Sequence, residues 1–391
     1  MKYGNPMREG SNSGSRHFLL GFFSPNCDGG NTISTIPDAW VADWDSLRNL
    51  TVAADKAGLD FMLPISRWRG WGGKSNFQGN GIECLSYVAA TAPLTKRINL
   101  FATINVASQN PVVVAKQIAA VDQLSKGRAG INMVCGWNPR EQGIYGIGQL
   151  AHDEQYLYAQ EWIDIARKIW TAGSGRGDYE GRYFKCSNLD EVQGPPPYRE
   201  APLLINAAQS PVGRVFAEQN CDYILHACHD LETGGSAVAE IKADAKRRFG
   251  RNFDLLTTAH IICRPTEAEA RDYHQYVLDH ADLEATENLM SAVGLNYDTI
   301  MNMGLATNAS EAEIRANYEA QRNRWTTGHG TYGPIMGTPD QVADTICRFN
   351  EIGYSGFAFS FINYMNDLPY FRQEVMPRLE ARGIRQPVGE I

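Results

Sequence analysis

The chain has 391 residues, of which 43% are hydrophobic and 20% charged, and its formal net charge is −8. The acidic balance argues against a nucleic-acid partner, and we find no run of about 18 apolar residues of the kind that crosses a membrane. The eight cysteines stand singly, without CxxC pairs, which is typical of reduced, mostly buried thiols in a cytoplasmic protein.

Short apolar runs alternate with helical stretches along most of the chain. The runs are rich in branched and aromatic residues and are bounded by turn residues, as expected of parallel strands covered on both faces. The predicted strands span residues 17–23, 60–65, 98–106, 129–135, 202–208, 222–227, 256–263 and 356–362. The helices predicted between them include 44–57, 82–92, 111–125, 154–171, 211–219, 234–248 and 339–352.

Eight strands with intervening helices, and no break in composition, predict one α/β domain. We expect a (β/α)8 TIM-like barrel over residues 17–391, preceded by a polar N-terminal arm at 1–16. The alternative, a doubly wound sheet, is weaker because the stretch FFSPNCDGGN after the first predicted strand lacks the GxGxxG turn.

Three connections are too long to be simple links, at residues 66–81, 173–200 and 270–338. The last is the largest insertion and contains two predicted helices, 267–283 and 310–323. Excursions of this length in a barrel usually form lids or walls at the C-terminal ends of the strands. We therefore expect the insertions to lie at the C-terminal face.

Several polar residues follow or interrupt the predicted strands near that face. Asn132 lies inside the apolar strand 129–135, where its amide could bind a heterocycle or a small oxygen species, or be satisfied by backbone as a core residue. Thr103 has the same two readings, since threonine is common in strands. Glu141 follows the strand and could lie at the barrel mouth, although most glutamates are simply solvated.

Two further stretches carry candidate ligand-binding groups. In SRWRGWGG, Arg67 and Arg69 could neutralise an anionic ring or phosphate or could form surface salt bridges, and the nearby tryptophans could stack on a ligand or pack the loop. In NAAQSPVG, Ser210 is predicted as a helix N-cap with Pro211 at the first helical position. This arrangement leaves backbone N–H groups for a phosphate, although an ordinary capped helix has the same pattern.

Metal-dependent and simple hydrolytic chemistry is not indicated. His226, Cys228 and His229 in HACHD match no standard zinc spacing, and no metal is expected. The sequence contains no GxSxG or Walker motif. An aromatic, amide-lined and phosphate-ready site suits a bound organic cofactor instead.

The stretch KGRAGINMVCGWNPREQGIYG resembles the strand-four signature of the bacterial luciferase-like, flavin-dependent monooxygenases. The resemblance continues through HDEQYLYAQEWIDIARKIW, YEGRYFKC, LLINAAQSPVGRVFAEQNCDYIL and GTPDQVADTICRFNEIGYSGFAFSF, and so covers nearly the whole chain. DFMLPISRWRGWGG and NLFATINVASQNP look most similar to the pyrimidine and dimethylsulfone monooxygenases of that superfamily. The chain departs from the pattern in carrying Arg67 where a lysine is found and Gln155 where an arginine usually precedes the tyrosine.

The resemblance implies FMN as cofactor. It implies that Thr103 and Asn132 hold dioxygen beside flavin N5, so that a flavin-N5-peroxide forms (or a C4a adduct, as in the luciferases). The residues that it implies for FMN binding are Ser66, Arg67, Thr103, Asn132, Glu141, Tyr156 and Ser210.

The resemblance further implies an enzyme that uses reduced FMN and O2 to oxygenate or cleave a small heteroaromatic, amide or organosulfur compound. A separate NAD(P)H:flavin reductase would supply the reduced flavin, and a cytoplasmic homodimer or homotetramer is expected. Two alternatives stay open, namely a deazaflavin- or flavin-dependent oxidoreductase that transfers hydride, and a non-catalytic flavin-binding protein.

Overall fold

Eight parallel strands form a closed barrel in the computed structural model, which describes residues 5–9, 17–136, 138–171, 177–199, 201–252, 254–306, 309–328 and 331–387. The strands are β1 (Leu19–Phe23), β2 (Phe61–Leu63), β3 (Asn99–Asn105), β4 (Ala129–Val134), β7 (Leu203–Asn206), β8 (Tyr223–Leu225), β9 (Asp254–Cys263) and β11 (Gly356–Ser360). All eight lie within two residues of a predicted strand. The (β/α)8 barrel expected from the sequence is confirmed.

The barrel closes because β8 and β9 pair at one side and β11 pairs with β1 at another. A ninth strand, β10 (Pro334–Gly337), adds in parallel to β9 outside the closed ring. Thr103 of β3 lies directly opposite Asn132 of β4 in this register. Two residues that are 29 positions apart in the sequence are thus neighbours on adjacent strands.

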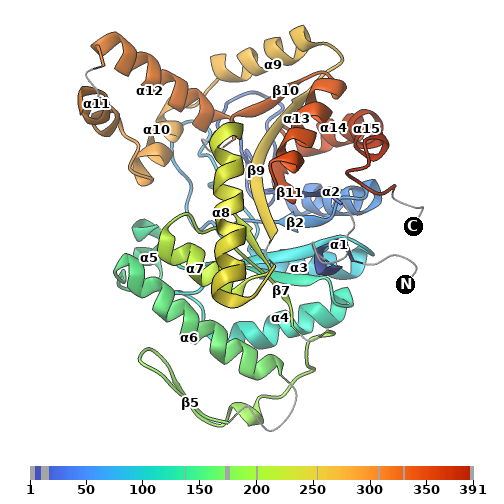
Figure 1. The fold of residues 1–391 in the computed structure, drawn as a ribbon, viewed down its shortest axis with the longest axis vertical. Helices are drawn as coiled ribbons and strands as arrows, with labels where there is room; N and C mark the ends of the chain where they lie inside the picture. The colour runs from blue at the N-terminus through green and yellow to red at the C-terminus, as the bar shows by residue number, and fades with distance from the viewer. Residues whose placement is uncertain are drawn as a thin grey trace.

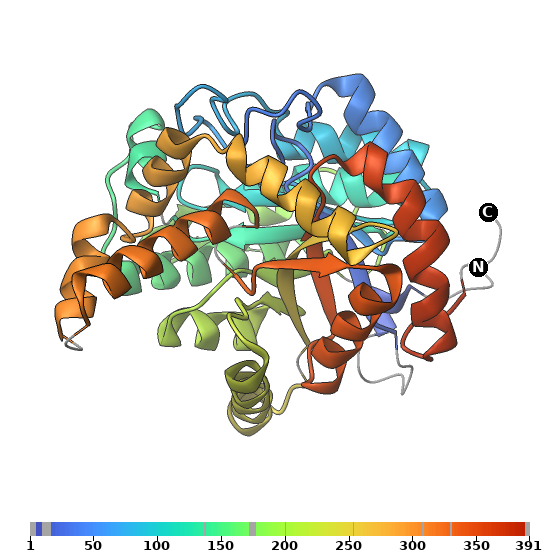
Figure 2. The same ribbon diagram turned by 90° about the horizontal axis from the view of Figure 1, so that it is seen from above.

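Helices pack around the barrel and connect successive strands (Figures 1 and 2). They are α2 (Trp44–Ala57), α3 (Cys84–Thr91), α4 (Pro111–Ser125), α5 (Pro139–Ile144), α6 (His152–Trp170), α7 (Pro211–Asn220), α8 (Leu231–Phe249), α13 (Pro339–Glu351), α14 (Tyr364–Tyr370) and α15 (Met376–Ala381). The bounds of α2 and α4 coincide with the predicted helices. Their local start signals explain this, since Asp43 and Asn110 accept hydrogen bonds from the first free backbone N–H groups.

Apolar side chains form two layers of core, one between barrel and helices and one inside the barrel. The inner layer contains Phe61, Phe101 and Leu256, together with Met7 from the short N-terminal helix α1 (Pro6–Glu9). Met7 is buried, and its carbonyl accepts a hydrogen bond from the Tyr223 hydroxyl. The described part of the predicted polar arm therefore plugs the end of the barrel opposite the C-terminal ends of its strands.

The 270–338 insertion folds largely into helices that lie beside and above the barrel. The helices of this region are α9 (Glu267–Asp279), α10 (Leu283–Ala292), α11 (Tyr297–Ala306) and α12 (Glu311–Thr326). In Figure 1, α10, α11 and α12 lie at the upper left and α9 across the top. Met290, Ile300 and Ile314 form a small core of their own within it. The 173–200 excursion contains the hairpin β5 (Tyr179–Glu180) and β6 (Lys185–Cys186), at the bottom of Figure 1.

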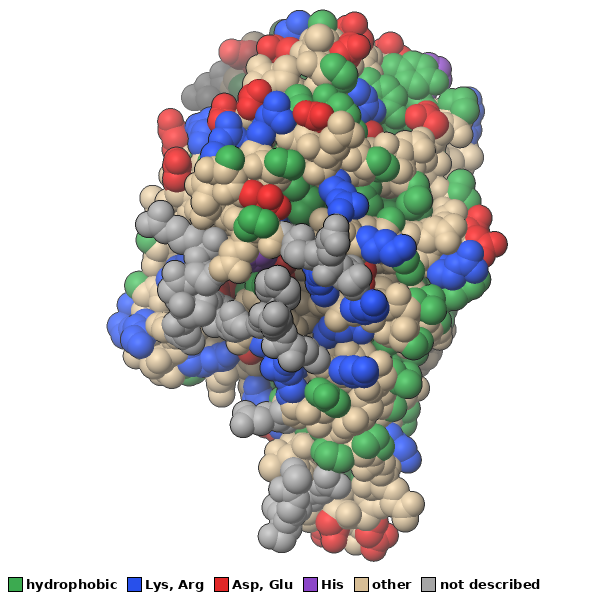
Figure 3. All heavy atoms as spheres, turned by 90° about the vertical axis from the view of Figure 1, so that its right-hand side faces the viewer, with side chains coloured by type: hydrophobic (Ala, Val, Ile, Leu, Met, Phe, Trp, Pro, Cys, Tyr) green, Lys and Arg blue, Asp and Glu red, His purple; other side chains and the backbone are tan. Residues whose placement is uncertain are grey.

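Acidic and basic side chains are mixed on the surface that carries both termini (Figure 3). Basic groups stand mainly across the middle of this face and acidic ones toward its upper and lower ends. All eight cysteines are free thiols, six of them buried, as the sequence predicted. In the described ranges, no helix is long and apolar enough to span a membrane.

Candidate functional site

A carboxamide and a hydroxyl meet inside the C-terminal half of the barrel. Asn132 Nδ2 donates to Thr103 Oγ1 at 3.1 Å, and Thr103 Oγ1 donates to the carbonyl of Pro64 at 2.5 Å. Both side chains are about 4% exposed. The pair is rigid, because each side chain is held by its neighbour and by the backbone that follows β2.

The oxygen of the same carboxamide is left over. Asn132 Oδ1 is buried and has no hydrogen-bond partner among the described residues, and the same holds for Asn206 Oδ1 at the end of β7. The amide nitrogen of Asn206 donates to the Met133 carbonyl at 2.8 Å, which fixes the side chain beside β4. Leaving a buried acceptor unpaired costs roughly 1–3 kcal/mol, so these two oxygens are suited to N–H groups of a ligand.

An ion pair lies on the β2 side of the mouth. Arg67 Nη1 and Glu141 Oε1 are 3.1 Å apart, and both side chains are more than 90% buried. Arg67 Nε also donates to Gln78 Oε1 at 3.0 Å, and the guanidinium lies 5.0 Å from the centre of the Trp71 ring. Because a buried pair is strongly held only when its remaining hydrogen-bonding groups are satisfied, Gln78 and the loop 66–81 are part of this arrangement.

A cradle for an anion lies at the N-terminus of α7. Ser210 is the N-cap, and its Oγ accepts from the Gly213 N–H at 3.3 Å, with Pro211 in the first turn. The Tyr156 hydroxyl, from the first turns of α6, lies beside this cap, and burial raises the pKa of Tyr156. A Cβ on Gly213 would lie 2.4 Å from that hydroxyl, so only glycine leaves this space open.

Residues of the 270–338 insertion pack against the part of the barrel formed by β9 and β11. His260 of β9 is fully buried, and its Nδ1 lies 2.9 Å from the Ser360 hydroxyl of β11. Gly328, just after α12, sits on that histidine, since a Cβ added there would be 2.9 Å from His260 Cβ. The expected position of the insertion, against the C-terminal face, is thus seen in these contacts.

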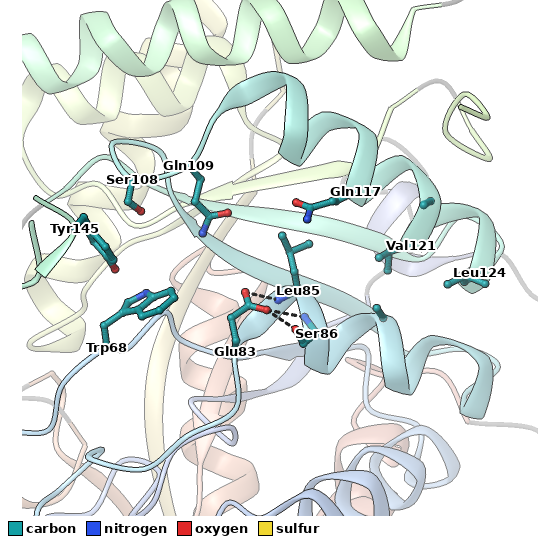
Figure 4. A pocket seen from close by; sticks show the side chains of 12 residues that line it. Trp68, Glu83, Leu85, Ser86, Ser108, Gln109, Gln117, Val121, Leu124 and Tyr145 are labelled. Atoms are coloured by element: carbon teal, nitrogen blue, oxygen red, sulfur yellow. Dashed lines mark hydrogen bonds between the residues drawn. The ribbon is translucent and has the colours of Figure 1, made fainter. Parts of the chain in front are cut away.

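A groove of about 570 Å³ lies outside this constellation, between α3 and α4 (Figure 4). Trp68 and Tyr145 stand at one end of it, edge to face with ring centres 5.5 Å apart. Burial raises the pKa of Tyr145 to about 12. Glu83 at the groove caps α3 through the N–H groups of Leu85 and Ser86, so its carboxylate serves the helix.

The seven residues expected to bind the cofactor lie in barrel strands or in the segments that follow them, and the structure brings six of them together in pairs. The pairs are Thr103 with Asn132, Arg67 with Glu141, and Tyr156 with Ser210. Ser66 lies beside the loop tryptophan, accepting from Trp68 Nε1 at 3.2 Å. Trp137, in the quoted strand-four signature, lies outside the described residues.

Sequence reasoning missed several groups that complete the site. Gln78 stands in the glycine-rich stretch NFQGNG, and its link to Arg67 depends on the fold of the whole loop. Asn206 was within the quoted NAAQSPVG stretch but was not singled out. His260 belongs to the largely buried strand β9, and a histidine near the C-terminal end of such a strand is the signal that could have identified it.

A flavin mononucleotide fits these groups. The α7 N-terminus offers backbone N–H groups, the Ser210 hydroxyl and the Tyr156 hydroxyl to a phosphate. The buried oxygens of Asn132 and Asn206 offer acceptors to a ring N–H. No group of three potential metal ligands lies together in the part of the chain that the structure describes.

Known proteins share both the sequence pattern and the fold. The model of the luciferase-like monooxygenase family matches residues 19–356. The pyrimidine monooxygenase RutA of Allorhizobium ampelinum is 28% identical over 375 residues, which cover 93% of this chain and 96% of the relative. RutA of Acinetobacter baylyi is 26% identical, over 93% of this chain and 95% of the relative.

Solved structures agree with this fold. The long-chain alkane monooxygenase LadA superposes with a TM-score of 0.82 at 20% identity, covering 96% of this chain and 94% of that one. A riboflavin lyase, RcaE, solved with modified FMN and riboflavin, gives the same score at 21% identity, covering 94% and 92%. Because its family model matches most of its length, this chain belongs to the luciferase-like monooxygenase family.

Proposed function

We propose that this protein is an FMN-dependent monooxygenase that uses reduced FMN and O2 to insert one oxygen atom into a small organic substrate, such as a heteroaromatic, amide or organosulfur compound. The observation that carries the proposal is the Asn132–Thr103 pair, whose buried carboxamide oxygen faces no protein donor in the described ranges. Membership of a monooxygenase family supports it independently.

The roles of the residues follow from their positions. Ser210, Tyr156 and the first N–H groups of α7 bind the phosphate, because the helix end attracts an anion and Gly213 leaves room for the Tyr156 hydroxyl beside it. The Arg67–Glu141 pair, with Ser66 beside it, forms a polar wall for the ring. When bound, the reduced flavin supplies the electrons that activate O2.

Thr103 and Asn132 then act on the oxygen side. The Thr103 hydroxyl donates to Pro64 and accepts from Asn132, so the free carboxamide oxygen keeps a fixed direction. Hydrogen-bond donors that are oriented in advance in this way, such as the second N–H of the same carboxamide, stabilise negative charge that develops on oxygen better than mobile donors do. The buried surroundings of this pair exclude bulk water.

A partner enzyme, a cellular location and an oligomeric state belong to the same proposal. A separate NAD(P)H:flavin reductase supplies reduced FMN, because the turn after the first strand, FFSPNCDGGN, lacks the dinucleotide-binding GxGxxG pattern. The eight free thiols support a cytoplasmic location. Exposed apolar side chains on α4, Val113 and Leu124, each more than half exposed, support assembly into a homodimer or homotetramer.

Cofactor choice and oxygen use test this function together. We expect FMN to bind more tightly than FAD in a fluorescence titration, since the sequence has no recognisable motif for an adenylate. With a flavin reductase and NADH, the FMN-loaded protein should couple O2 consumption to oxygenation of a substrate. Tighter FAD binding would contradict the cofactor assignment. Hydride transfer with a deazaflavin under anaerobic conditions would favour the oxidoreductase alternative, and flavin binding without any O2 consumption the non-catalytic one.

A further inference from the structure

A second carboxamide without a partner lies in the segment that follows β1. Asn31 is 0% exposed, and neither its Nδ2 nor its Oδ1 has a hydrogen-bond partner among the described residues. The hydroxyl of Thr32 beside it is buried without a partner as well. Burying an amide whose donor and acceptor both lack a partner lowers the stability of the fold, by roughly 1–3 kcal/mol for each group.

The backbone of Asn31 is held between two parts of the candidate site. Its carbonyl accepts from the Gly328 N–H at 3.1 Å, and Gly328 lies on His260 at the end of β9. The preceding carbonyl, of Gly30, accepts from Gln78 Nε2 at 3.0 Å, and Gln78 is the residue bonded to Arg67. Asn31 therefore lies at the barrel mouth, between the insertion and the Arg67–Glu141 pair.

The strand order separates this amide from the groups proposed for the oxygen and phosphate sides, whereas Arg67 follows the neighbouring strand β2. Its segment follows β1, which pairs with β11 and β2, whereas Asn132 is on β4 and Ser210 follows β7. Asn31 is bonded to Gly328 of the insertion, so it lies on the side of the mouth that the insertion covers, where a substrate would be enclosed above the ring.

We propose that Asn31 recognises the substrate through an adjacent donor and acceptor, as presented by an amide, imide or urea. A carboxamide carries one acceptor oxygen and an NH2 donor, so such an edge can satisfy both by two parallel hydrogen bonds. An alkane would leave both groups unpaired, and a sulfone, which only accepts, would leave the Asn31 oxygen unpaired. This inference rests on the proposed function and narrows its substrate class.

Binding to the FMN-loaded protein tests the proposal without turnover. Calorimetric titration with uracil, ethyleneurea and acetamide, against dimethyl sulfone, should show binding of at least one amide-type probe and weaker binding of the sulfone. The Asn31→Leu variant should bind that probe at least tenfold more weakly and should bind FMN with unchanged affinity. Its melting temperature without ligands should stay equal or rise, because a leucine of similar volume removes two unpaired polar groups.

A matched control is Asn220→Leu. Asn220 is equally buried but fully bonded, to Gln160, Arg167 and a backbone carbonyl, and lies at the far end of α7. This variant should lower the melting temperature by several degrees and leave probe binding unchanged.

Two outcomes would overturn the role of Asn31. If Asn31→Leu loses stability as the control does while probe binding is unchanged, the amide is structural and satisfied by a buried water. If the sulfone binds and no amide-type probe does, or if none of the four probes binds, the substrate class is wrong although FMN binding stands. Failure of the wild-type protein to bind FMN would instead refute the proposed function.

Discussion

Single carboxamides mark the mouth of this barrel. Asn31, Asn132 and Asn206 are each buried, and each has at least one amide atom without a partner among the described residues. They belong to segments at three different places around the ring, the β1 loop, β4 and β7. Buried polar atoms in folded proteins are nearly always paired, so a concentration of exceptions at one end indicates where a ligand binds.

At this scale we expect oxygenation to depend on Asn132 and Thr103 more than FMN binding does. Asn132→Ala and Thr103→Val should each lower kcat for oxygenation at least tenfold, about 1.4 kcal/mol in the barrier, because each removes an oxygen-side contact. FMN affinity, measured by fluorescence titration, should fall by a much smaller factor than kcat does. Thr51→Val is the control, since Thr51 is equally buried but bonds Tyr87 outside the barrel. Normal turnover in both site variants would disprove the assignment.

At the scale of elements, the N-termini of α4 and α7 show how a helix cap differs from an anion-binding site. Caps of the same type begin α4 and α7, each with an N-cap side chain and a proline at the start of the helix. Only α7 combines the cap with a glycine at the third position whose missing Cβ makes room for a tyrosine hydroxyl. A cap by itself serves the helix, and the tyrosine hydroxyl that lies beside the cap is what suits α7 to an anion.

Ser210→Asp separates these two roles of the α7 N-terminus. Aspartate is a good N-cap, so the melting temperature should stay near that of the wild type, but its carboxylate would repel the phosphate. We expect FMN affinity to fall at least tenfold, whereas riboflavin, which lacks the phosphate, should be affected much less. Asn110→Asp, the same change of charge at the α4 cap, should leave both affinities unaltered. Equal losses for FMN and riboflavin would place the phosphate elsewhere.

At the end of the barrel where the strands begin, ion pairs and hydrogen bonds join distant parts of the chain. Asp60, at the start of β2, bonds the Arg385 guanidinium at 2.7 Å and His17 at 2.9 Å. Arg385 also donates to the carbonyls of Phe18 and Gly58. Burial alone would raise the pKa of Asp60, but Arg385 and His17 outweigh it and lower the pKa to about 2. The C-terminal segment is thereby fastened under the barrel.

Acid should remove the stabilisation that Asp60 gives to the fold, within a defined pH range. Because the folded pKa of Asp60 lies below its ordinary value of 3.8, its ionisation stabilises the fold above pH 4, and this contribution is lost as the pH falls toward 2. Arg385→Met should lower the melting temperature by several degrees at pH 7, since it leaves a buried carboxylate poorly compensated. The difference from wild type should shrink between pH 4 and pH 2.5 in calorimetric scans. A difference independent of pH would mean that Arg385 acts by packing alone.

The strands, most helices and the order of the fold could be predicted from the sequence, because they depend on local patterns. Branched apolar runs bounded by turn residues marked all eight barrel strands, and caps such as Asn110 marked helix starts. The likeness of strand four and of the Ser210 turn to a known family pointed to the site. These signals lie within short windows and need no knowledge of distant contacts.

Only the tertiary structure decided which of these residues meet. Arg67 and Glu141 are 74 positions apart, and their ion pair forms because β2 and β4 lie on either side of β3 in the ring. Asn31 reaches the mouth because the insertion returns Gly328 onto His260. Met7 fills the barrel floor although it belongs to a polar segment. Such contacts depend on barrel closure, which pairs residues by strand order and register and leaves no periodic signal in the sequence.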